Sequence, residues 1–138
     1  MGTRALINVR KLDKASAIFT TIYHHADGYP SYLGERIKEV LGSKELTNGV
    51  SDPDTQVNGM GCAAAMLVGA LKGGECGGVY IYAPGTNDVW EEYVYDLYAG
   101  DKCVAMTVTT GGGEELFSGK LSDFSAAKCT EKDDGYAA

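Results

Sequence analysis

Residues 58–74, NGMGCAAAMLVGALKGG, are the stretch around which the rest of the chain is organised. Apolar residues recur in it at the i, i+3, i+4, i+7 spacing of a helix face, and the opposite side is hardly more polar. Asn58 can cap the start of a helix, and Gly73 can take the left-handed conformation that ends one. The pattern therefore predicts a helix that is covered on all sides, from which only Lys72 must reach water.

The composition is typical of a soluble globular protein. Of the 138 residues, 44% are hydrophobic and 22% are charged, which suits one domain with a real core. We expect that domain to span residues 1–129 and a flexible acidic tail to follow at 130–138. The net charge of −7 argues against general nucleic-acid binding, because phosphate contacts need clustered Lys and Arg. The N-terminus lacks the apolar stretch of a signal peptide and nothing later could span a bilayer, so we expect a cytoplasmic protein without membrane binding.

Alternating apolar residues and turn signals place the other elements. A surface helix is expected at 30–41, and a long polar loop at 43–57 that is a candidate binding element. Strands are expected at 5–10, 17–25, 79–83, 89–99, 103–109 and 116–120. The first two would form a hairpin and the next three an antiparallel meander. The predicted fold is α+β, an antiparallel sheet of about five or six strands with two helices packed on one face.

A ligand-binding surface is predicted at the start of the central helix. Gly59 and Gly61 belong to a G-x-G-x-x-A pattern whose bare amides can receive a phosphate. A dinucleotide fingerprint would need a preceding strand in a parallel unit, and here a polar loop precedes it. Close backbone packing is the ordinary explanation, and a resting anion or nucleotide phosphate is the alternative.

The same surface would draw in other segments. We expect the loop 47–57 and the turn 27–30 to converge on the helix start. Tyr29 would stack on a base or fill a pocket of a partner, and Arg4 or Arg36 would add positive charge. The predicted ligand-binding residues are Tyr29, Asn58, Gly59, Gly61, Arg4 and Arg36.

Cys62 is the candidate for an alternative, catalytic interpretation. In the first turn of a helix the dipole lowers a thiol pKa, which could make Cys62 a nucleophile. His24 or His25 could act as its base, but only one of the two, because adjacent strand residues point to opposite faces. Asp27 could orient that base. The ordinary explanation is a small core residue, and the four scattered cysteines indicate reduced structural thiols.

Five blocks of the chain together resemble a group of small phage and prophage proteins. They are residues 1–4 (MGTR), 23–30 (YHHADGYP), 58–64 (NGMGCAA), 77–82 (GGVYIY) and 91–95 (EEYVY). The resemblance runs from Met1 to about Phe124. It implies an accessory protein of viral origin that works in the cytoplasm of a bacterial host, with a counter-defence or host-modulating role, and it implies no particular activity.

Two functional classes follow from these observations. The first is a binding protein without catalysis, which docks on a host protein or sequesters a small nucleotide-like ligand. The second is a cysteine-dependent hydrolase or transferase built on Cys62 with His24 or His25. Binding is favoured because no motif assembles a nucleophile, a base and an oxyanion site. No cofactor and no metal are expected, and the sequence leaves a homo-oligomer open.

Overall fold

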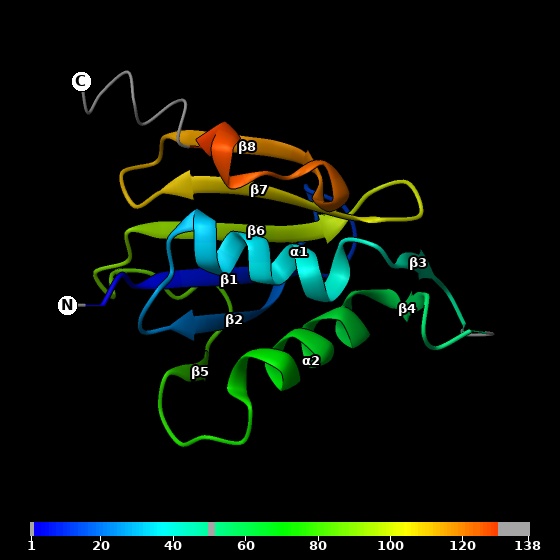
Figure 1. The fold of residues 1–138 in the computed structure, drawn as a ribbon, viewed down its shortest axis with the longest axis horizontal. Helices are drawn as coiled ribbons and strands as arrows, with labels where there is room; N and C mark the ends of the chain where they lie inside the picture. Colours follow the sequence, from blue (N-terminus) through cyan, green and yellow to red (C-terminus); the bar gives the residue numbers. More distant parts are fainter. Residues whose placement is uncertain (1, 50–51, 130–138) are drawn as a thin grey trace.

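A mixed sheet of six strands forms the centre of the molecule (Figure 1). The computed structural model describes residues 2–49 and 52–129. In order across the sheet, the strands are β5 (Val79–Tyr82), β2 (Ile18–His24), β1 (Ala5–Arg10), β6 (Tyr93–Ala99), β7 (Val104–Thr110) and β8 (Glu115–Lys120). Neighbouring strands are antiparallel except β1 and β6, which are parallel.

Helices cover one face of this sheet (Figure 1). After β2 the chain forms a π-helical turn, η1 (Pro30–Gly34), which continues into α1 (Glu35–Leu41), and α2 (Gly59–Lys72) packs beside α1. The strands β3 (Glu45–Thr47) and β4 (Gln56–Asn58) pair in parallel as a small second sheet, and the short helix η2 (Leu121–Asp123) follows β8. The predicted α+β fold with two helices on one face is confirmed.

The antiparallel meander predicted for the second half is wrong at its first connection. Strand β5 pairs with β2 rather than with β6. Tyr82 and Tyr80 pack against Tyr23 of β2, with ring centroids 5.3 and 5.9 Å apart, and these contacts hold β5 at the outer edge. Residues 83–92 must therefore cross the sheet, and β6 joins β1 in parallel. The crossing passes over the face without helices, where the Gly85 amide donates to Thr21 Oγ1 at 2.9 Å.

The hydrophobic core lies between the helices and the sheet. Ala5, Ile7 and Val9 alternate along β1 as predicted, and all three are fully buried. Tyr95 of β6 is also fully buried, and its hydroxyl donates to the Gly28 carbonyl oxygen at 2.6 Å. Burial raises the pKa of Tyr95 well above its ordinary value of 10.0, so this hydroxyl keeps its proton.

Helix α2 is buried on one side only, which corrects the prediction that it is covered all round. Its buried residues are Met60, Ala63, Ala64 and Leu67. Gly61, Ala65 and Gly69, spaced four residues apart, are exposed on the other side. Small side chains carry too little apolar surface to force a helix face inwards, so the sequence did not separate the two sides.

The two ends of α2 differ from each other. Gly73 has φ of 58° and its amide donates to the Gly69 carbonyl, as predicted for the C-terminus. Asn58 makes no side-chain cap, because its Oδ1 accepts the amide of Gly49 instead. The capping role predicted for Asn58 is therefore wrong, and Asn58 ties β4 to the loop after β3.

The remaining predictions are met in part. The loop 43–57 contains the small β3–β4 sheet, and the tail predicted at 130–138 lies outside the described residues. Phe124, next to η2, is fully buried and packs edge-on against Phe117 at 5.2 Å. Within the part of the chain that the structure describes, no helix has the length and hydrophobicity of a membrane span.

Candidate functional site

One end of the sheet gathers segments that are distant in sequence. At this end β1 and β6 begin and β2 stops, to the left in Figure 1. The Gly28 amide donates to the Thr3 carbonyl at 2.8 Å, and the Glu92 amide donates to the Arg4 carbonyl at 2.8 Å. The turn after β2 and the end of the crossing loop therefore flank the residues that lead into β1.

Glycine is required at position 28 for this arrangement. A Cβ atom there would lie 2.6 Å from the Ala5 Cβ and 2.8 Å from the Thr3 carbonyl oxygen. Asp27 before it has φ of 58°, a conformation that aspartate tolerates better than most residues. The Asp27–Gly28 pair thus makes the tight turn that places Gly28 against the start of β1, with Tyr29 directly after it.

Tyr29 and Tyr32 project from this turn into solvent. Their side chains are 39% and 47% exposed, and their ring centroids lie 6.4 Å apart. Tyr32 belongs to η1, where the Tyr32 and Leu33 amides both donate to the Tyr29 carbonyl. The two rings are therefore held by the same turn of backbone.

Trp90 is the most exposed large hydrophobic residue in the described part of the chain, at 82%. Its φ of 65° is rare for a bulky residue, and Asp88 two positions earlier has φ of 64°. Hydrogen bonds surround this segment: the Val89 amide donates to Glu91 Oε1 at 3.0 Å, and the Gly111 amide to the Glu92 carbonyl at 2.8 Å. The backbone on both sides of Trp90 is thus held by hydrogen bonds.

We call the exposed residues Tyr29, Tyr32 and Trp90 the aromatic end, because all three belong to segments at this end of the sheet: the two tyrosines to the turn on the helix side, and Trp90 to the end of the crossing loop. Tyr29 directly follows Gly28 and Trp90 stands two residues before Glu92, so both belong to the segments that flank Thr3 and Arg4. Asp88 and Glu92 are also exposed here. The aromatic end therefore combines exposed rings with carboxylates.

His24 lies buried next to the aromatic end. Its side chain is only 9% exposed, its ring centroid is 6.5 Å from that of Tyr32, and its Nδ1 has no hydrogen-bond partner among the described residues. Burial lowers the pKa of His24 from its ordinary value of 6.5, and the backbone of Ala26 and the charge of Asp27 oppose this only in part. His24 is therefore neutral at pH 7.

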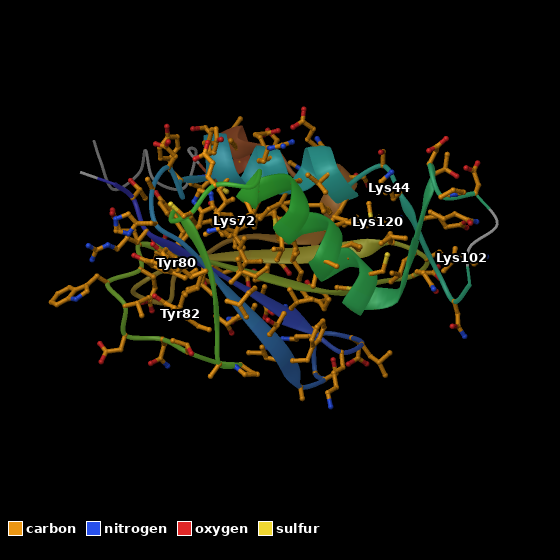
Figure 2. All side chains as sticks on the ribbon, turned by 90° about the horizontal axis from the view of Figure 1, so that it is seen from below. Lys44, Lys72, Tyr80, Tyr82, Lys102 and Lys120 are labelled. Atoms are coloured by element: carbon orange, nitrogen blue, oxygen red, sulfur yellow. The ribbon has the colours of Figure 1, made fainter. Side chains whose placement is uncertain are left out.

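A second aromatic cluster lies on the helix-free face at the edge of the sheet. It consists of Tyr23, Tyr80 and Tyr82, and Figure 2 shows Lys72 from the end of α2 beside Tyr80. The Lys72 ammonium is 5.4 Å from the Tyr80 ring centroid and donates to the carbonyls of Gly77 and Val79. Burial raises the pKa of Tyr23, and the charge of Arg4 opposes the shift.

The predicted ligand-binding residues fall into two separate groups. Tyr29 belongs to the aromatic end, Arg4 precedes β1 and its charge acts on Tyr23, and Arg36 lies near the C-terminus of α2, where its Nη2 donates to the Ala70 carbonyl at 3.4 Å. Asn58, Gly59 and Gly61 lie at the N-terminus of α2, roughly 13–18 Å from Ala70 along the helix. The predicted convergence of the turn 27–30 with the helix start is therefore wrong, because α2 separates them (Figure 1).

The predicted catalytic residues are also separated. Cys62 is half-buried in the first turn of α2 and packs against the core. His24 pairs with Val79, whose carbonyl binds Lys72 at the far end of the same helix, ten positions along from Cys62 and so about 15 Å from it. His25 Nδ1 is hydrogen-bonded to the Tyr23 hydroxyl at 2.8 Å on the helix-free face. Neither histidine reaches Cys62, so Asp27, whose charge acts on His24, does not complete a catalytic set with that thiol.

Metal binding and similarity to known proteins give no further guide. No group of three or more His, Cys, Asp or Glu side chains among residues 2–49 and 52–129 could hold a metal ion. Comparison of the chain with family models, with curated proteins and with solved structures finds no match.

Trp90 was not singled out from the sequence. It stood in a predicted strand at 89–99, because Trp90, Glu92 and Val94 alternate with Tyr93 and Tyr95. The strand begins only at Tyr93. The turn-forming residues 84–88 were the available signal that the crossing loop extends as far as Trp90.

Proposed function

We propose that this chain is a binding protein without catalytic activity, which docks on a partner protein through the aromatic end. The observation that carries the proposal is Trp90, 82% exposed on a backbone with φ of 65°. Tryptophan and tyrosine dominate the binding energy of protein interfaces, because their rings bury a large area at a small entropy cost. Tyr29 and Tyr32 supply two more such rings at the same end.

The backbone at Trp90 supports a functional reason for the indole. A bulky residue held at positive φ costs about 1–3 kcal/mol, and an indole in water returns little of that through burial. Glycine would fit the conformation without strain. Strain of this kind is expected where a side chain has to be presented to something outside the fold.

The charges at the aromatic end indicate the kind of partner. Asp88, Glu91 and Glu92 surround Trp90 in sequence, and the whole chain carries −7. Carboxylates and an indole face both attract cations, the indole through its π system. We infer a partner that presents Lys or Arg side chains to this end.

Two other functions have less support. A nucleotide-like ligand at Gly59 and Gly61 would lack the positive charge expected from Arg4 and Arg36, which lie at the other end of α2. A cysteine-dependent reaction would lack a base near Cys62. The resemblance to small phage proteins adds that the partner would be a host protein, with a counter-defence or host-modulating outcome.

The test is capture of the partner by matched variants. Tagged wild type, Trp90→Ala and Leu12→Ala are each incubated with host extract and with the purified captured protein. Leu12 is the control because it is 68% exposed but lies near the end of β6, where the Ala99 amide binds its carbonyl. Circular dichroism checks that all three variants are folded.

The proposal expects wild type and Leu12→Ala to capture the same protein, and Trp90→Ala to lose at least about tenfold in affinity, the effect of removing a tryptophan hot spot. Salt should weaken binding, since charge pairs contribute. Undiminished capture by Trp90→Ala would show that another surface carries the function.

A further inference from the structure

Strand β5 leaves one edge of the six-stranded sheet open. It pairs with β2 on one side, and no strand of residues 2–49 or 52–129 pairs with it on the other. The His25 amide donates to the Gly78 carbonyl at 2.8 Å. In this antiparallel register the backbone N–H and C=O groups of Tyr80 and Tyr82 also point towards β2. The backbone groups of Val79 and Ile81 therefore point outwards.

The outward backbone groups of Val79 and Ile81 differ in whether they already have a hydrogen-bond partner. The Val79 carbonyl accepts Lys72 Nζ at 2.9 Å, so the start of the edge is occupied. Among the described residues, none hydrogen-bonds to the outward N–H and C=O of Ile81. Ile81 thus presents one free donor and one free acceptor, side by side on the same residue.

An apolar groove adjoins Ile81 on the helix side of the sheet. Its volume is about 580 Å³, and it is lined by Ala64, Ala65, Val68 and Gly69 of α2 together with Phe19 and Ile81 of the sheet. The Ile81 side chain is 59% exposed at its rim. The exposed small residues of α2 let a second backbone come close to this wall.

The charge distribution favours a second copy of the chain as the occupant. Copies of a chain with a net charge of −7 repel each other wherever carboxylates meet. None of the described residues that line the groove is charged, so two copies can meet here without that penalty. A foreign protein drawn by the negative charge would be directed to the carboxylate-bearing surfaces instead.

We propose that a second copy of this chain docks at the β5 edge and makes a two-fold symmetric dimer. The two β5 strands pair antiparallel with Ile81 opposite Ile81, so that each free N–H donates to the other copy's free C=O. In this register Tyr80 stands opposite Tyr82 of the second copy, which extends the tyrosine cluster across the axis. The two groove walls close over the paired Ile81 side chains.

Lys72 limits the hydrogen-bonded pairing of the two β5 strands to the residues around Ile81. A longer ladder would need the Val79 carbonyl, which Lys72 already holds. A lysine at an edge strand is a common defence against uncontrolled strand addition. Pairing through β5 therefore joins only two copies, because it uses the free edge of β5 in both of them.

The experiment measures the mass of the full chain in solution by light scattering and sedimentation across the micromolar range. Wild type and Leu12→Glu are expected to be dimers. Ile81→Glu is expected to be a folded monomer, because paired strands would bring two carboxylates directly opposite each other. Its dissociation constant for dimerisation should be at least about tenfold higher than that of wild type. Ile81 is exposed, so the substitution leaves the protomer intact.

A covalent test gives the register independently. Residues directly opposite in a hydrogen-bonded antiparallel pair have Cα atoms about 5.5 Å apart, within the span of a disulfide. Ile81→Cys, with the exposed Cys76 changed to Ser, should oxidise to a linked dimer, and Leu12→Cys in the same background should not. A monomeric wild type, a dimer untouched by Ile81→Glu, or equal cross-linking of both cysteines would overturn the proposal.

Discussion

Replacing Trp90 by glycine and by alanine separates the backbone strain from the indole. Both substitutions remove the same side chain, so the burial that the indole contributes cancels in the comparison. The two variants differ in the free-energy cost of φ at 65°, which is about 1–2 kcal/mol for alanine, as for any L-residue, and is absent for glycine. Glycine loses about 0.5–1 kcal/mol through its freer unfolded state. We expect Trp90→Gly to be more stable than Trp90→Ala by about 0.5–1 kcal/mol.

Thermal and urea unfolding followed by circular dichroism measure this difference. For a chain of 138 residues it corresponds to a melting temperature higher by about 2–4 °C in the glycine variant. The control is Asn87, an exposed neighbour without positive φ, where alanine should be the more stable substitution. If alanine at position 90 equals or exceeds glycine, the backbone there is not strained and the argument from strain fails.

Three further predictions concern the core, His24 and Cys62. Leu67→Ala should cost about 2–5 kcal/mol in urea unfolding, because Leu67 is fully buried in α2; a loss below ~1 kcal/mol would place Leu67 outside the core. The lowered pKa of His24 means that the unfolded chain takes up a proton below pH 6.5 that the folded protein resists, so stability is full above pH 6.5 and falls by at most ~1.4 kcal/mol per pH unit below it. His24→Phe should abolish this pH dependence of stability, and His25→Gln should keep it. The opposite result would show that His24 is not the residue responsible. Cys62→Ala should bind the partner as wild type does, with a modest loss of stability; a variant that is folded and inactive would restore the catalytic interpretation.

The local parts of the fold could be predicted from the sequence. The alternation of Ala5, Ile7 and Val9 indicated a strand with one buried face, and Gly73 indicated the end of α2. Both signals depend on neighbours in the chain, so they do not need the rest of the fold. The same holds for the turn at Asp27 and Gly28.

The long-range arrangement could not be predicted in this way. The position of β5 depends on Tyr80 and Tyr82 meeting Tyr23, more than fifty residues earlier in the sequence. Without that pairing, the order of strands read along the chain favoured a meander. The parallel pairing of β1 and β6 could not be predicted for the same reason, because it requires β5 to pair with β2 and not with β6.

The candidate site was half predicted for the same reason. Tyr29 and Arg4 were named from the turn and the N-terminal segment, and these two segments are joined by the hydrogen bond from the Gly28 amide to the Thr3 carbonyl. Gly59 and Gly61 were joined to them only by assuming that the helix start faces the turn. Trp90 was missed because positive φ in a residue other than glycine leaves no pattern in the sequence.

The fluorescence of Trp90 tests the central claim most directly, because it is the single tryptophan of the chain. The free protein should show the emission of a water-exposed indole that acrylamide quenches readily. Titration with the purified partner should shift that emission to the blue and protect it from quenching, with the same midpoint as binding measured by calorimetry, using a tryptophan-free variant of the partner. Saturated binding that leaves the emission and quenching of Trp90 unchanged would contradict docking through the aromatic end.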